Sequence, residues 1–188
     1  NERLNAEIES SKLVKTIAVV SNEARAIDET LHFCIRKICE FAGWPLGHLY
    51  LTAENPSDGL FPTKIWHVEE PGKFDTFQKI TKETLFEEGV GLPGRVLNSG
   101  EPAWIMDVTK DSNFPRAKLA ENIGVKAGFA FPIMIGKKVV GVMEFFSPKA
   151  VKPDPEILDI MAQIGTQLGR VLERKQAQDT SERSHDQL

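Results

Sequence analysis

Three glycines in the stretch GVGLPGRV have the spacing of a dinucleotide-binding loop. Gly89, Gly91 and Gly94 match G-x-G-x-x-G, and Asp111 follows about where such a loop would place its ribose-binding acid. That loop must follow a buried strand and present a helix N-terminus to a pyrophosphate. The preceding KETLFEEG is instead amphipathic and acidic, so it would repel a phosphate. We therefore interpret the glycines as a turn that leads into a short helix.

The histidines and cysteines offer no arrangement for catalysis. They are scattered, without an H-x-x-x-H or C-x-x-C pattern, at His32, His48, His67, His185, Cys34 and Cys39. Nucleophilic or acid-base catalysis needs a nucleophile and a base that the fold brings together, and no such set stands out. We expect this segment not to be an enzyme.

The two cysteines also indicate the compartment. Cys34 and Cys39 are five residues apart on a helical pattern, which places them on different sides of a helix. We therefore expect no disulfide between them, and we expect a reducing, cytoplasmic setting.

Charge and hydropathy exclude two further classes of partner. The 23 basic and 27 acidic residues are mixed along the chain, with a net charge of -4. The basic surface typical of nucleic-acid or anionic-membrane binding is therefore missing. No apolar run reaches the roughly 18 residues that a membrane span needs. At 188 residues and 41% hydrophobic content we expect one domain, cut from a longer protein because the chain begins with Asn1.

Long helical patterns stand at both ends of the chain, over residues 2–41 and 155–178. Apolar residues spaced by four and three form a seam in each, which favours contact between two chains before Asp28 and along the second helix. The predicted dimer-interface residues are Leu13, Ile17, Val20, Ala24, Ile164, Leu168 and Val171. We expect a dimerisation helix over 1–27, a domain over 28–175, and a polar, disordered linker over 176–188.

Strand pairs lie between the helices. Residues 48–52 alternate leucines with His48 and Tyr50, as a half-buried strand does, and a partner strand is predicted over 63–69. Residues 127–135 and 138–147 are apolar on both faces and flank a tight turn, which predicts a central hairpin covered above and below. Residues 103–106 form a short strand, and residues 74–85 and 92–97 form short helices.

In this order of elements, the segments EEGVGLPGRVLNSGEPAWIMDV, FPRA, FAFPIMIGKKVVGVMEFFS and PDPEILDIMAQIGTQLGRVLERK resemble a GAF domain of bacterial multidomain signalling proteins. The resemblance covers about residues 28–175. It implies an α+β fold with a twisted antiparallel sheet of five to six strands. Terminal helices would pack on one face, and short helices and loops would form a ligand pocket on the other.

The resemblance also implies a regulatory role. Such a domain binds a small molecule and relays its state through dimeric terminal helices to a covalently linked output domain, commonly a histidine kinase or a diguanylate cyclase. The alternative is a dimerisation spacer that binds no ligand.

Mapped residue by residue, the resemblance places a pocket on this sequence. Arg95 and Arg116 would reach an anionic group of the ligand. Glu144, amid apolar strand residues, either contacts the ligand or pairs with a neighbouring Lys or Arg, and we favour the pairing. The candidate ligand-binding residues are Trp66, Leu92, Arg95, Val96, Trp104, Met106, Asp107, Phe114, Arg116, Ala117, Ala130, Pro132 and Glu144. For any single aromatic residue among them, core packing is the stronger interpretation.

Known functions of the family narrow the ligand only in part. Bilin-binding members carry a cysteine beside the helix near Phe114, and free methionine sulfoxide reductases rely on cysteines near the pocket; this chain has neither. His48 and His67 are more often strand histidines than haem ligands. Residues 73–75 spell K-F-D, a fragment of the N-K-F-D-E signature of cyclic-nucleotide members. A cyclic nucleotide is therefore a candidate ligand, and no cofactor is assigned.

Overall fold

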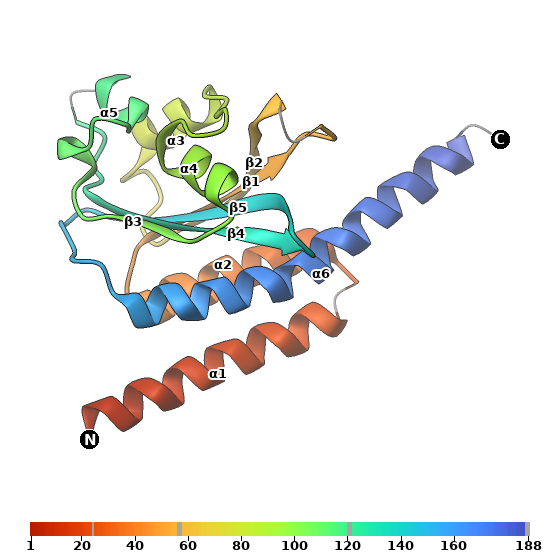
Figure 1. Cartoon of the computed structure of the whole chain (residues 1–188), viewed down its shortest axis with the longest axis horizontal. Coiled ribbons are helices and arrows are strands. Elements are labelled where there is room, and N and C mark those ends of the chain that lie inside the picture. The colour runs from red at the N-terminus through yellow and green to blue at the C-terminus, as the bar shows by residue number, and fades with distance from the viewer. Residues whose placement is uncertain (24, 56–57, 120–121, 187–188) are drawn as a thin grey trace.

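The computed structural model places a β-sheet between two layers of helices (Figure 1). It describes residues 1–23, 25–55, 58–119 and 122–186. Within these residues the sheet has five antiparallel strands in the order β2-β1-β5-β4-β3. Their bounds are β1 Leu46–Thr52, β2 Leu60–Val68, β3 Ala103–Ile105, β4 Ala127–Ile135 and β5 Lys138–Ser147. The predicted α+β fold with an antiparallel sheet is confirmed.

The β4–β5 hairpin forms the middle of the sheet. Gly136 at its turn has a φ of 61°, a left-handed conformation that glycine adopts without strain. β5 pairs with β4 on one side and with β1 on the other. Both strands of the hairpin are buried over most of their length, because their apolar side chains face covering layers on both sides. The prediction of a central hairpin covered on both faces is confirmed.

One face of the sheet is covered by short elements, called the wall below. They are α3 Asp75–Lys82, α4 Gly91–Ser99, η2 Val108–Lys110 and α5 Pro115–Leu119. Figure 1 shows the wall on the opposite side of the sheet from the long helices. A cluster of buried apolar side chains, called the wall cluster, fills the space between the wall and the sheet.

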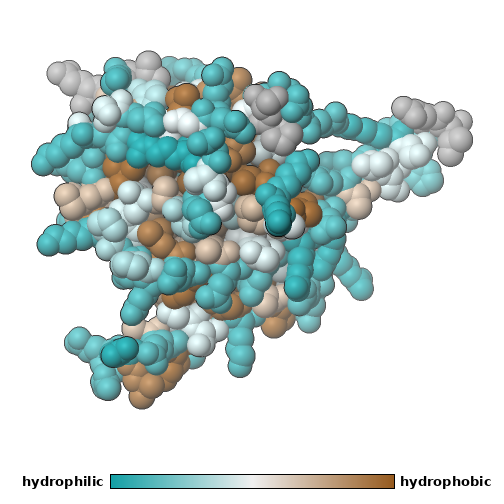
Figure 2. All heavy atoms as spheres, viewed as in Figure 1, coloured by the Kyte–Doolittle hydropathy of each residue, from teal (hydrophilic) through white to brown (hydrophobic). Residues whose placement is uncertain are grey.

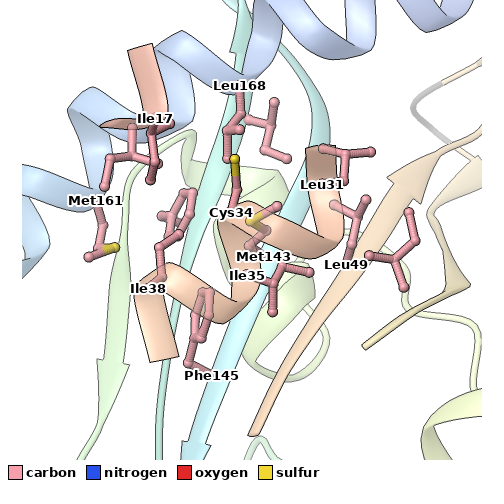
Figure 3. Packing of buried hydrophobic residues seen from close by; sticks show 14 of the residues in the cluster. Ile17, Leu31, Cys34, Ile35, Ile38, Leu49, Met143, Phe145, Met161 and Leu168 are labelled. Atoms are coloured by element: carbon pink, nitrogen blue, oxygen red, sulfur yellow. The ribbon is translucent and has the colours of Figure 1, made fainter. Parts of the chain in front are cut away.

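The other face is covered by three long helices, α1 Glu2–Glu23, α2 Ile27–Ala42 and α6 Pro155–Asp186. α2 and α6 lie against the sheet, and α1 lies farther out (Figure 1). Apolar side chains from the helices and the sheet form a second cluster, the helix cluster. Figure 3 shows Ile17, Cys34, Phe145 and Leu168 meeting in it from α1, α2, β5 and α6. Within the described ranges, no helix combines the length and apolar character of a membrane span.

α6 extends farther than the sequence indicates. The segment expected to be a disordered linker, 176–188, is helical through Asp186, and residues 187–188 lie outside the described residues. After Gly169 the helix contains no glycine or proline, and it is rich in Arg, Glu and Gln, which favour helix. The polar composition therefore indicated an exposed helix rather than an unstructured segment.

The apolar residues spaced by four and three on α1 and α6 pack against each other within one chain. Ile17 of α1 and Leu168 of α6 are fully buried in the helix cluster. The same burial or packing applies to Leu13, Val20, Ile164 and Val171, whereas Ala24 lies outside the described residues. An intramolecular helix pair needs the same spacing as a dimer seam. These side chains therefore pack, wholly or in part, against partners in the same chain.

α6 approaches the sheet closely at two glycines. A Cβ atom added at Gly165 would overlap the backbone carbonyl oxygen of Pro132, and one added at Gly169 would overlap that of Met134. Both carbonyls belong to β4, where Pro132 and Met134 pair with Val142 and Val139 of β5. The missing side chains therefore set how closely α6 packs on the sheet.

The two cysteines face the helix cluster. Cys34 is fully buried and Cys39 is 3% exposed, and Figure 3 shows Cys34 within the packed interior. Burial raises the pKa of Cys34 to about 12, and burial, with the charges of Glu69 and Glu40, raises the pKa of Cys39 further. Neither thiol is poised to act as a nucleophile.

We expect both thiols to react with a thiol reagent only when the protein opens. In buffer the labelling rate should be at least about 10³-fold lower than in concentrated urea, because reaction must wait for opening of the core. Mass spectrometry of samples quenched over time would measure this, with Cys34→Ser and Cys39→Ser variants identifying each site. Rapid labelling of the native protein would show that α2 does not cover these thiols.

Candidate ligand-binding site

Arg116 lies at the centre of the wall cluster. It stands on α5, only five residues long, and its side chain is fully buried. The α5 helix packs against α3, and the guanidinium reaches across the interior to β5. A charged side chain in this position needs a partner inside the protein.

The partner is Glu144 of β5, which is also fully buried. Arg116 Nη1 donates to Glu144 Oε1 and Nη2 to Oε2, both at 2.8 Å, and Nη1 also donates to Thr81 Oγ1 at 3.0 Å. This is the planar two-bond geometry that suits a guanidinium and a carboxylate. Burial alone would raise the pKa of Glu144, but the Arg116 charge and hydrogen bonds lower it overall. The pair is therefore ionised, and the predicted pairing of Glu144 with a basic residue is present.

Four aromatic rings surround the guanidinium. Arg116 Cζ lies 4.7 to 5.2 Å from the ring centroids of Phe77, Phe86, Phe114 and Phe146. Cations at such distances are attracted to the negative face of an aromatic ring. The rings and the carboxylate together form a cage for a cation, and Arg116 occupies it.

Two polar residues of β1 complete the site. His48 pairs directly with Glu144 in the β1–β5 register, and its ring stacks on Trp66 at 3.9 Å. His48 Nε2 donates to Thr63 O at 3.0 Å, which leaves Nδ1 facing Glu144 Oε1 at 3.4 Å. The Tyr50 ring packs against His48, and burial, followed by the Glu144 charge, raises the pKa of Tyr50 well above its usual value.

Buried polar atoms without a hydrogen-bond partner gather here. Five side-chain atoms in the described residues have this property, and three of them are His48 Nδ1, Tyr50 Oη and Arg116 Nε. Leaving a buried polar group unpaired costs about 1 to 3 kcal/mol, so this network is incomplete.

His48 and Tyr50 were missing from the predicted site. Their alternation with Leu49 and Leu51 suggested a strand with one solvent-facing side, yet both are fully buried. The alternation of side chains along the strand could have identified them. When β1 pairs with β5, His48 and Tyr50 lie on the same face of the sheet as Glu144. Phe77, Phe86 and Phe146, whose rings surround Arg116, were likewise missing from the predicted site.

Most of the predicted site residues are brought together. Leu92, Val96, Phe114 and Ala130 are buried in the wall cluster, and Trp66 and Ala117 pack against it. Pro132 is buried opposite Val142, a member of the same cluster. The structure therefore places these predicted residues together on the wall face of the sheet.

Arg95 is used elsewhere in the wall. It forms a two-bond ion pair with Asp111 and donates from Nη2 to Asn113 O at 2.8 Å. The Asn113 side chain in turn accepts from Gly91 N and donates to Gly89 O, both at 2.9 Å. The glycine-rich turn is thus tied to the loop before α5, which supports the interpretation as a turn into a short helix.

Three predicted residues lie outside the site. Trp104 is on the opposite face of the sheet, against Trp44 and Phe129, and its Nε1 donates to Val151 O at 2.9 Å. Met106 is 46% exposed, and Asp107 caps η2 by accepting from Thr109 N at 3.0 Å. Side chains alternate along a strand, so Ala103 and Ile105 face the wall cluster and Trp104 cannot. The assignment of these three to the pocket is wrong.

The interior around Arg116 is filled by side chains. Open hollows lie elsewhere, including a groove of about 390 Å³ that Leu51, Val140 and Leu172 help to line. Another of about 630 Å³ lies between α1 and the start of α6. Neither reaches Arg116, so a ligand at Glu144 would have to displace a group of the protein.

Comparison with known structures agrees with this architecture. The A. aeolicus nlh2 GAF domain in an inactive state superposes with a TM-score of 0.66 at 19% identity, covering 90% of this chain and 99% of that one. The GAF domain of a Coxiella burnetii phosphoenolpyruvate-protein phosphotransferase gives 0.73 at 15%, covering 94% and 99%. A free methionine-R-sulfoxide reductase from Neisseria meningitidis, in complex with its substrate, gives 0.68 at 16%, covering 89% and 91%.

At such identities these similarities show the fold alone. A transcription factor from Arabidopsis thaliana, GLABRA 3, is 39% identical over 62 residues, which are 32% of this chain and 10% of that protein. This chain therefore spans about a tenth of that relative. A family model described as GAF domain matches residues 24–173. That match covers most of the chain, and the protein belongs to the GAF domain family.

Proposed function

We propose that this GAF domain is a small-molecule sensor whose ligand binds in the wall cluster, beside Glu144 and Arg116. The observation that carries the proposal is the set of unpaired atoms His48 Nδ1, Tyr50 Oη and Arg116 Nε around a buried ion pair. A partly satisfied polar network destabilises the interior more than an apolar filling would. A polar ligand that formed hydrogen bonds with these atoms would remove this destabilisation. The free energy recovered would contribute to binding of the ligand.

The sheet offers a route from the ligand to the helices. Glu144 faces the wall, and its neighbours on β5, Met143 and Phe145, face the helix cluster. A change in the wall therefore reaches side chains that pack on α2 and α6. We infer that two arrangements of these helices differ in ligand affinity, as a switch requires, and that α6 passes the difference to a covalently linked histidine kinase or diguanylate cyclase.

A homodimer through the terminal helices fits this proposal, on a different surface from the predicted seam. Leu4 and Ile8 of α1 are 55% and 44% exposed, and Figure 2 shows apolar atoms at that end of the helix. Exposed apolar side chains at neighbouring helical positions favour a partner helix.

Other functions are less well supported. A bilin or sulfoxide-reductase site needs a thiol near the wall, whereas Cys34 and Cys39 lie in the helix cluster. We infer that the segment has no catalytic activity, since no activated nucleophile lies in the described part of the wall cluster. A cyclic nucleotide would need a cation for its phosphate, and Arg95 and Arg116 are each paired with a carboxylate.

The filled interior favours a second candidate, a dimerisation spacer without a ligand. A thermal-shift screen separates the two, using cyclic nucleotides, carboxylates, amines and guanidinium compounds. A sensor at ligand concentrations about 100-fold above its Kd should gain about 2.7 kcal/mol, which is roughly 5 to 10 °C in Tm for a chain of this size.

Tyr50→Phe removes one unpaired hydroxyl from the site and should reduce that shift. Met106→Leu, on the surface away from the site, serves as the matched control and should leave it unchanged. If no compound shifts the Tm and native mass spectrometry finds no copurified molecule, the spacer function is the correct one.

A further inference from the structure

The cage around Glu144 is a binding site for a cation that the protein fills with its own side chain. We propose that the ligand is an organic cation of the guanidinium or alkylammonium class, which displaces Arg116 from Glu144. The inference rests on the proposed sensor function and specifies its ligand. Arg116 then acts as an internal competitor that occupies the site and stabilises the ligand-free state.

The first argument is the hydrogen-bonding character of the site. Glu144 is an ionised acceptor, and Thr81 Oγ1 accepts from Arg116. His48 Nε2 donates to the carbonyl oxygen of Thr63, and its Nδ1 lies 3.4 Å from Glu144 Oε1. Tyr50 Oη can accept as well. The oxygen acceptors of Glu144, Thr81 and Tyr50 suit a ligand with many N–H donors, and Arg116 leaves the acceptor of Tyr50 unused.

The second argument is that most of the cage does not depend on Arg116. Phe77 belongs to α3, Phe146 to β5, and Phe86 to the segment that bridges Leu60 of β2. Of the four rings, only Phe114 adjoins α5. If the guanidinium left, three aromatic rings and the carboxylate would stay in position to bind another cation.

The third argument is which partner can move. Glu144 lies on β5, hydrogen-bonded between β1 and β4 in the middle of the sheet. Arg116 lies on a five-residue helix at the outside of the wall (Figure 1). Movement of α5 would carry the guanidinium out to water, whereas movement of Glu144 would disrupt the sheet.

An anionic ligand fits the same site poorly. Its charge would meet Glu144, and the Nη1 and Nη2 groups of Arg116 already bind that carboxylate. Only Nε of Arg116 is free to donate. Release of Arg116 toward an anion would leave the Glu144 charge buried and unpaired, which is strongly unfavourable.

The direction in which Arg116→Met changes the affinity for a cation tests the proposal. Arg116→Met keeps an apolar stem in the cage and removes the competitor. Isothermal titration should therefore give at least about 10-fold tighter binding of ethylguanidinium to this variant than to the wild type, a difference of about 1.4 kcal/mol. Ethylurea, which has a similar shape and no charge, should show no such gain. In the Arg116→Met background, Glu144→Gln should remove the gain.

Hydrogen exchange of the wild-type protein gives a second test that needs no variant. Ethylguanidinium should speed the exchange of the α5 amides while the β5 amides become better protected. Unchanged exchange in α5, or weaker binding to Arg116→Met, would overturn the proposal.

Anionic probes separate this proposal from the sensor function. If cyclic AMP or inorganic phosphate binds the wild type and Arg116→Met loses that binding, the domain is a sensor and the cation proposal is wrong. If no probe binds either protein, both proposals are wrong.

Discussion

Glu144→Ala should lower the free energy of unfolding by about 3 to 5 kcal/mol, because it leaves the fully buried Arg116 charge without its carboxylate. Arg116→Met, which strands the carboxylate instead, should have a similar effect. The double variant Arg116→Met/Glu144→Leu should recover most of the loss, since a well-packed apolar pair often replaces a buried ion pair without cost. Urea denaturation of the wild type, Arg116→Met, Glu144→Leu and their double variant at neutral pH gives the coupling energy as a double-mutant cycle.

Acid should remove the same contribution. The pKa of Glu144 is lower in the folded protein than the usual value of 4.5, so the stabilisation is fully present above about pH 4.5. It decreases as the pH falls through the lower, folded-state pKa. The stability difference between the wild type and Glu144→Gln should therefore shrink in acid.

Glu40→Ala is the matched control for the ion pair. Glu40 lies on the surface of α2, 55% exposed and near Arg36 and Lys37, and its loss should cost less than about 1 kcal/mol. If Glu144→Ala cost no more than this control, the buried pair would not be formed in solution.

Gly169→Ala should destabilise the protein, although alanine normally favours a helix by about 1 kcal/mol over glycine. The added Cβ would overlap the carbonyl oxygen of Met134, and a strand backbone cannot turn aside as a side chain can. Overpacking of this kind costs about 1 to 3 kcal/mol, occasionally more, and Gly165→Ala should add to it through Pro132. The free energy of unfolding in urea measures both effects.

Thr166→Ala is the control on the same helix. Thr166 is exposed and bonds only to Ala162 of its own helix, so this change should be close to neutral. A Gly169→Ala variant as stable as this control would mean that α6 packs less closely on β4 than described.

The sheet and its layers could be predicted from the sequence, because alternation and turn residues are local signals. The β4–β5 hairpin is the clearest case, with two apolar strands joined at Gly136. Trp104 was misplaced because a three-residue strand offers too few positions to fix which face is inward. If Ile105 had been assigned to the wall face of the sheet, the alternation along the strand would have placed Trp104 on the helix face.

The site could be predicted only in parts. Arg116 and Glu144 were each singled out, but their pairing depends on how α5 folds over β5, and 28 residues separate them. The helix seams show the same limit, since the spacing of Ile17 and Leu168 fits a partner in the same chain as well as one in another. Side-chain spacing identifies an apolar face but not what covers it.

Gly165 and Gly169, where α6 contacts the sheet most closely, lie near the middle of the helix. The C-terminal half of α6 extends beyond these contacts. At a rise of 1.5 Å per residue, the part of α6 after Gly169 reaches about 25 Å to Asp186. Pivoting on β4 by about 5° would therefore displace the far end by about 2 Å, comparable to helix shifts that switch proteins between states. A small rearrangement of the sheet, without opening of the domain, could thus produce a larger displacement at the C-terminal end of α6.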